Sequence, residues 1–174
     1  LLDQAIGVTD AKVCRKIAGA ISDGPGRRQV LDLIDFVEIA IRCEDDPKYL
    51  PDSLAIAKFG SPVLRAAAMT LAGEVALRQD DTALASSLLE SASREAVRVA
   101  EPADRALLTL RIASAYSQRK LPQALELFRA AITDANRTDG FGVADINRGY
   151  VILELSWSDV AERTPLSLRG IGLA

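Results

Sequence analysis

The sequence predicts an all-α fold, built as an array of antiparallel helical hairpins in a single domain over residues 1–174. Aromatic residues make up only 5% of the chain and alanine is abundant. This composition favours close-packed helices, because β-sheets rely on aromatic and β-branched side chains. Apolar residues recur with the helical period of 3.6, as at Leu108, Ile112 and Ala115. Clusters of Gly, Pro and Asp then divide the chain into segments of helical length.

The first third of the chain contains turn signals that separate four predicted helices. The opening residues give a weak signal over 1–6, and Thr9-Asp10 predicts the start of a helix that ends near residue 20. The Gly- and Pro-rich run 22–26 breaks the chain. A long helix is predicted over 27–43, where an acidic run ends it, and a short helix over 51–59.

The rest of the chain consists of helices that follow one another through short turns. Gly60, Ser61 and Pro62 are typical of a helix end followed directly by the N-cap and the first residue of the next helix. Asp80-Asp81 and Lys120-Leu121 predict tight turns, and 138–142 predicts a loop. Helices are therefore predicted over residues 62–79, 82–100, 101–119, 122–136 and 143–156.

An arginine recurs near the start of the first helix of each predicted pair. The spacings are 37, 40 and 43 residues, and the positions are Arg28, Arg65, Arg105 and Arg148. A period near 40 with two helices per unit is typical of an α-solenoid. Because a cation opposes the dipole at a helix N-terminus, we expect structural partners for these arginines. Each would form an ion pair with a carboxylate or bond to the carbonyls that end the preceding helix. The candidate carboxylates close in sequence are Glu101, Asp104 and Asp145, and a row of anion contacts is the alternative.

Two helix pairs also carry a pattern of small and large apolar residues. Ile112-Ala113-x-x-Tyr116 is followed by Ala124-x-x-x-Phe128-x-x-Ala131, and Leu71-Ala72-x-x-Val75 by Ala85-x-x-x-Leu89-x-x-Ala92. In this pattern the chain resembles the tetratricopeptide repeat family over about half of its length. The period near 40 exceeds that of the family, and Thr109 stands where a large apolar residue is usual. The resemblance implies a right-handed α-solenoid of helical hairpins.

The resemblance also implies a concave groove, lined by the first helix of each pair, where extended peptides bind. Carried over by position, the groove would hold Ala66, Met69, Gly73, Ala76, Leu77, Leu107, Leu110, Ser114, Ser117 and Gln118. The strongest candidates for partner binding among them are Met69, Leu77, Leu107, Leu110, Ser114 and Gln118. Because this surface is so apolar, we expect a neighbouring helix, a second copy of the chain or an apolar segment of a partner to cover it.

Two charged segments have a structural and a functional interpretation. Asp32, Asp35 and Glu38 recur every three residues on one long helix. They form either a solvated face with a Glu38–Arg42 pair, which we favour, or a three-carboxylate metal site. The run 22–28 could cradle an anion at a helix start, but it lacks the spacing of a phosphate-binding loop. We favour the structural interpretation of both segments and expect no cofactor and no metal.

The composition excludes several classes of function. The chain has no histidine, which removes Ser-His-Asp and Cys-His catalytic systems and imidazole zinc ligands. The net charge of −3 and the lack of a basic stripe argue against nucleic-acid binding, and no apolar run is long enough for a membrane span. Cys14 and Cys43 are expected to be too far apart for a disulfide. Free thiols favour a reducing, cytoplasmic compartment only weakly.

The sequence therefore predicts a non-enzymatic helical-repeat scaffold that binds a protein or peptide, or a second copy of itself. The alternative is a helical regulatory or accessory domain of a larger enzyme or sensor protein. The chain starts with Leu1, and Pro165-x-x-Leu168-Arg169 echoes the Pro62–Arg65 start of an earlier unit. We therefore expect these residues to be part of a longer chain.

Overall fold

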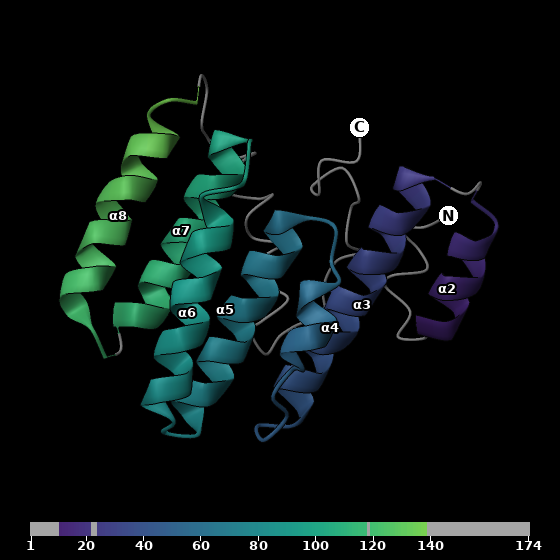
Figure 1. Ribbon diagram of the computed structural model, residues 1–174, viewed down its shortest axis with the longest axis horizontal. Coiled ribbons are helices and arrows are strands. Elements are labelled where there is room, and N and C mark those ends of the chain that lie inside the picture. Colours follow the sequence, from purple (N-terminus) through teal and green to yellow (C-terminus); the bar gives the residue numbers. More distant parts are fainter. Residues whose placement is uncertain (1–10, 22–23, 118, 139–174) are drawn as a thin grey trace.

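Helices account for all the regular structure in the part of the chain that the computed structural model describes, which is residues 11–21, 24–117 and 119–138 (Figure 1). The helices are α2 (Ala11–Gly19), α3 (Pro25–Asp45), α4 (Ser53–Ala57), α5 (Pro62–Arg78), α6 (Thr82–Ala96), α7 (Pro102–Ser117) and α8 (Leu121–Ala135). The prediction of an all-α fold is confirmed for these residues. The helices predicted over 1–6 and 143–156 lie outside them.

The starts of α5 and α6 follow the capping signals of the sequence. Ser61 is extended and directly precedes Pro62, the first residue of α5. The side chain of Asp81 accepts a hydrogen bond from the backbone N–H of Leu84 at 3.0 Å and so caps α6. Asp80 has a φ of 59°, a left-handed conformation that aspartate tolerates better than most residues. This makes the turn between the two helices tight, as the sequence predicts.

The observed bounds of several helices differ from the predicted ones. The long helix α3 begins at Pro25 and runs to Asp45, two residues beyond the predicted range of 27–43 at each end. Proline is well suited to the first turn of a helix, so it starts α3 instead of preceding it. The helix predicted over 82–100 ends at Ala96, where the N–H of Val97 bonds to the Ser93 carbonyl.

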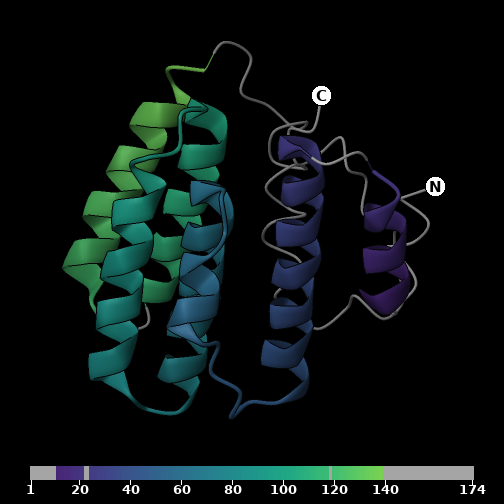
Figure 2. The ribbon, with the colours of Figure 1, turned by 45° about the vertical axis from the view of Figure 1, so that its right-hand side comes forward.

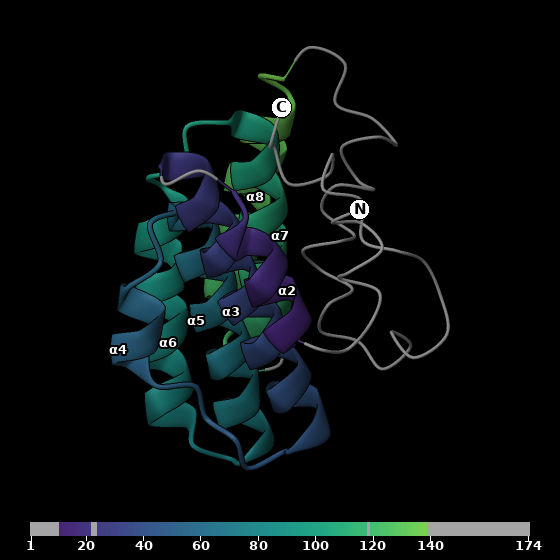
Figure 3. The ribbon, with the colours of Figure 1, turned by 90° about the vertical axis from the view of Figure 1, so that its right-hand side faces the viewer.

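The helices pack as neighbouring pairs in an array. α5 pairs with α6 and α7 with α8, each pair antiparallel across a short turn, and α3 packs against α5 (Figure 1). α3 also lies between α2 and the rest of the array (Figure 2). Seen from the α2 end, α4 and α6 lie on the same side of α3 and α5 (Figure 3). The described helices thus contain two complete hairpins, α5–α6 and α7–α8, side by side through contacts of α7 with both α5 and α6.

The main core is built on small residues of α5 and α7. Both helices are buried on most of their surface, and Ala113 of α7 is fully buried. At Gly73 a Cβ atom would lie 2.9 Å from the Leu89 side chain of α6, closer than real contacts allow. Glycine there lets α5 and α6 approach each other closely. Thr109, at the position where a large apolar residue is usual, is buried and donates a hydrogen bond to the Arg105 carbonyl at 2.7 Å.

A second, smaller core holds α2 against α3. It consists of Cys14 and Ala18 from α2 and of Val30 and Ile34 from α3. Cys14 lies in this core and Cys43 in the main one, and both are buried free thiols, as the sequence predicts. None of the helices in the described ranges is long and apolar enough to cross a membrane.

Candidate functional site

Arg65 joins three parts of the chain at the start of α5. Its Nε atom donates to Oε2 of Glu95, near the end of α6, at 2.9 Å. Its Nη1 atom donates to the carbonyls of Phe59 and Gly60, which end the segment before α5. The Arg65 side chain is 20% exposed and that of Glu95 is 13% exposed, so solvent screens this ion pair only in part.

Arg105 makes the same set of contacts one hairpin later. Its Nε and Nη2 atoms donate to the two carboxylate oxygens of Asp134, near the end of α8, at 2.7 and 2.9 Å. Its Nη1 atom donates to the Val99 carbonyl at 2.7 Å. In both hairpins the carboxylate also pairs with an arginine three residues further on, Arg98 or Arg137. We call each arginine with its carboxylate and carbonyl partners an arginine clamp.

The clamps confirm the structural interpretation of the recurring arginines. Arg28 also has structural partners. Its Nε donates to Asp32 at 2.9 Å and its Nη2 to the Lys58 carbonyl at 2.8 Å. The carboxylate that Arg105 hydrogen-bonds is Asp134, which the sequence did not indicate, while the charge of its neighbour Glu101 also raises the pKa of Arg105. The carboxylates of the two clamps lie 30 and 29 residues after their arginines, at the end of the second helix. Arg148 and Asp145 lie outside the described residues.

In the second clamp, Arg105 and Asp134 form an ion pair in which each group shifts the pKa of the other. Hydrogen bonds from the Arg105 guanidinium hold the pKa of Asp134 below its usual value, and those from Asp134 raise the pKa of Arg105. Both groups are therefore charged at neutral pH. Arg105 is near the N-terminus of α7 and Asp134 near the C-terminus of α8, where each charge alone opposes the helix dipole. Their pairing compensates both unfavourable positions.

The predicted groove residues differ in how far the chain covers them. Leu77 and Leu107 are buried, with 8% and 3% of their surfaces exposed, and Met69 and Leu110 are half-buried. The smaller positions Ala66, Gly73 and Ala76 are also buried. Ser114 and Ser117 are exposed near the end of α7, and Gln118 lies outside the described residues. Met69, Leu110 and the two serines are thus the predicted groove positions that keep solvent-exposed surface.

An ion pair that the sequence analysis missed joins the first helices of the two hairpins. Nη2 of Arg111 in α7 lies 2.9 Å from Oε2 of Glu74 in α5. The Arg111 side chain is only 4% exposed, which makes it the most buried arginine of any ion pair between described residues. A signal was present: Glu74 and Arg111 are single charges within otherwise apolar stretches of their helices, 37 residues apart.

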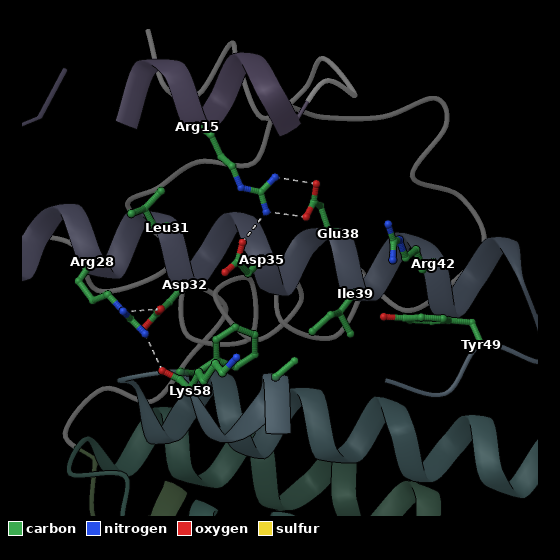
Figure 4. A pocket seen from close by; sticks show the side chains of 12 residues that line it. Arg15, Arg28, Leu31, Asp32, Asp35, Glu38, Ile39, Arg42, Tyr49 and Lys58 are labelled. Carbon is green, nitrogen blue, oxygen red and sulfur yellow. Dashed lines mark hydrogen bonds and ion pairs between the residues drawn. The ribbon is translucent and has the colours of Figure 1, made fainter. Parts of the chain in front are cut away.

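A cleft of about 540 Å³ lies beside α3, between α2 and α4 (Figure 4). The acidic row of α3 forms one wall, and arginines engage each of its members. Arg15 of α2 donates to both carboxylate oxygens of Glu38, at 2.8 and 2.6 Å, and to Asp35 at 2.5 Å. These bonds lower the pKa of Glu38 and raise that of Arg15. Asp32 is buried and accepts from Arg28 and from the Gly60 N–H.

The cleft corrects two expectations about the acidic row. The close partner of Glu38 is Arg15 and not the predicted Arg42, whose guanidinium lies 5.7 Å from the centre of the Tyr49 ring and lowers the pKa of Glu38 only through its charge. The row is also not simply a solvated face, since Asp32 is buried. Its oxygens serve to hold α2 and the segment before α5 onto α3. In the run 22–28, Arg28 is bound to Asp32 and to the Lys58 carbonyl, while Ser22 and Asp23 lie outside the described residues.

Comparison of the chain with known protein families, with curated proteins and with solved structures finds no match.

Proposed function

We propose that this protein is a non-enzymatic helical-repeat scaffold, resembling a tetratricopeptide array, that binds a protein or peptide or associates with itself. The observation that carries the proposal is the recurrence of the arginine clamp in α5–α6 and in α7–α8. A contact set that recurs at a spacing of 40 residues between Arg65 and Arg105 supports two copies of one unit. Stacked units of this kind bury a shared core and present an extended surface.

The binding surface that we propose is the face formed by the first helices α5 and α7. Met69 and Leu110 supply apolar side chains that are half-buried, and Ser114 and Ser117 supply exposed hydroxyl groups. The Glu74–Arg111 pair joins the two helices through a contact of 2.9 Å. A surface of this composition is suited to an apolar protein segment, because burying apolar side chains of both partners is favourable.

A capture experiment with matched variants tests this function. The wild-type chain, Leu110→Glu and Val97→Glu are each used as bait in a lysate, and retained proteins are identified by mass spectrometry. Val97 is 77% exposed outside the proposed surface, so it controls for adding a glutamate to an apolar site. We expect one protein to be retained by wild type and by Val97→Glu and lost with Leu110→Glu. Retention that is the same for all three baits would contradict the proposed surface.

A further inference from the structure

α8 lies at the edge of the described array and carries two exposed apolar side chains (Figure 1). Leu125 is 50% exposed and Ile132 is 57% exposed. They are seven residues apart, which is about two helical turns, and therefore lie on one face of α8. We call Leu125 and Ile132 the outer α8 face. Neither residue belongs to the proposed groove on α5 and α7.

The same face exists on α6, one hairpin earlier, and there it is partly covered. An apolar stripe recurs in the two helices at a constant spacing of 39 residues, as Ala85 with Ala124, Leu89 with Phe128 and Ala92 with Ala131. By this spacing, Leu125 and Ile132 correspond to Ser86 and Ser93 of α6. Both serines are half-buried.

The residues that cover this side of α6 come from the next hairpin. Nζ of Lys120, which precedes α8, donates a hydrogen bond to Oγ of Ser86 at 2.6 Å. Burial raises the pKa of Tyr116 in α7, and the charge of Glu90, which lies one turn from both serines, raises it further. The side of α6 that is equivalent to the outer α8 face is therefore the surface on which the following hairpin docks.

The sequence predicts a suitable helix directly after α8. The helix predicted over residues 143–156 is apolar on every side in its second half, where the run 150–153 is followed by Leu155. A helix of this kind is normally buried, as α5 and α7 are on most of their surface. The predicted connection, residues 136–142, is similar in length to residues 97–101, which join α6 to α7.

The recurring arginine gives the same register. Arg65 and Arg105 each donate to the backbone carbonyl six residues earlier, at the end of the segment before their helix. Arg148 lies in the predicted helix, and the residue six positions before it, Gly142, belongs to the predicted loop. The sequence after α8 therefore begins as the two described hairpins begin.

We propose that residues 143–156 form the first helix of a third hairpin and cover the outer α8 face, as α7 covers the corresponding side of α6. The proposal rests on the repeat arrangement of the proposed function and extends it by one unit. It makes α8 an internal helix of the array, because stacked repeats bury their apolar faces against their neighbours.

Thiol labelling of the whole 174-residue chain tests whether the face is covered. Ile132→Cys is compared with Val97→Cys, because Val97 is 77% exposed. We expect Ile132→Cys to react with a thiol-specific dye at least about tenfold more slowly, since a covered thiol reacts only when its cover opens. Equal rates would overturn the proposal. Protection that increases with protein concentration would also overturn it, because the cover would then be a second copy of the chain.

Two proline variants identify the covering segment. Gly149→Pro interrupts the predicted helix, because proline in a helix interior removes a hydrogen bond and clashes with the preceding turn. Gly140→Pro makes the same change in the predicted loop. Combined with Ile132→Cys, Gly149→Pro should raise the labelling rate to that of Val97→Cys, and Gly140→Pro should leave it slow. Protection that survives Gly149→Pro would mean that another part of the molecule covers the face, and the proposal would be wrong.

A stability measurement decides the question if Gly149→Pro unfolds the whole protein, which labelling of the buried Cys14 and Cys43 would reveal. Ile132→Glu should lower the melting temperature by about 5 °C or more, because it places a charge in an apolar contact, whereas Val97→Glu should leave it nearly unchanged. An equal effect of the two variants would overturn the proposal. The groove on α5 and α7 would still stand, because Leu110→Glu and partner capture test that surface separately.

Discussion

Arg105 and Asp134 lie at opposite ends of one hairpin's sequence and meet through two hydrogen bonds of 2.7 and 2.9 Å. The arginine is in the first turn of α7 and the aspartate in the last turn of α8, so the pair closes the hairpin. Arg65 and Glu95 make the corresponding contact in α5–α6. Because Arg105 also bonds to the Val99 carbonyl, the clamp ties each hairpin to the segment before it.

The first prediction concerns the strength of the clamp. Arg105→Ala should lower the free energy of unfolding by about 1–3 kcal/mol, because it removes charge-assisted hydrogen bonds at groups that are mostly shielded from solvent. Arg119→Ala is the matched control, since its partner Asp80 is 82% exposed and the pair should contribute less than about 1 kcal/mol. Urea unfolding followed by circular dichroism measures both. Equal losses for the two variants would show that the clamp is an ordinary surface ion pair.

A second prediction follows from the lowered pKa of Asp134. A carboxylate whose pKa is lower in the folded state stabilises the protein above its unfolded pKa of about 3.9, and that contribution is lost as pH falls through the folded value. Asp134→Asn removes the titrating group while keeping its size. We expect wild type to be more stable than Asp134→Asn at pH 7 and the difference to shrink as pH falls from about 4 toward the lowered pKa of Asp134. A difference that stays constant down to pH 3 would contradict the ionic nature of the contact.

Ala113 provides a prediction about packing. Its side chain is fully buried in α7, so Ala113→Leu should overpack the core and destabilise the fold by about 1–3 kcal/mol. The neighbouring Ser114 is exposed, and Ser114→Leu should change stability by no more than about 0.5 kcal/mol. Thermal unfolding of the two variants compares a buried and an exposed leucine one residue apart. An unchanged melting temperature for Ala113→Leu would mean that this position does not face another helix.

The cysteines should be unreactive while the protein is folded. Burial raises the pKa of the Cys43 thiol to about 11, and the thiolate is the form that reacts with labelling reagents. Cys14 is buried in the small core under α2. We expect a thiol-specific dye at pH 8 to label neither residue at an appreciable rate until denaturant is added. Rapid native labelling of Cys14 alone would indicate that α2 detaches from α3, and rapid labelling of Cys43 would contradict the packing of the main core.

Local signals made the helix starts predictable. Ser61 and Pro62 mark the start of α5 because their effect depends only on adjacent residues. The end of α6 was predicted four residues too late, because the apolar residues Val97 and Val99 continue the helical pattern. In the structure the chain turns at Val97, and the Val99 carbonyl is used by Arg105 of the next hairpin. This hydrogen bond is made by a residue outside α6, so the apolar periodicity of α6 does not indicate it.

The partners of the charged side chains were harder to predict than their roles. The position of Arg105 at a helix start indicates that it needs a partner, but only closure of the hairpin brings Asp134 to it. Arg42 lies one helical turn from Glu38, yet Glu38 pairs with Arg15. Docking of α2 on α3 places the Arg15 guanidinium against the carboxylates of both Asp35 and Glu38. Pairing across helices depends on tertiary geometry that sequence spacing does not contain.

The most direct test of the account is whether the two hairpins are equivalent units. Double-mutant cycles with alanine at Arg65 and Glu95 and at Arg105 and Asp134 measure the coupling energy of each clamp. The contacts predict a favourable coupling of about 1–3 kcal/mol in both cycles, similar in size. A coupling near zero in either cycle would mean that the recurring arginines do not close a repeated structural unit, and the proposal of a repeat scaffold would lose its main support.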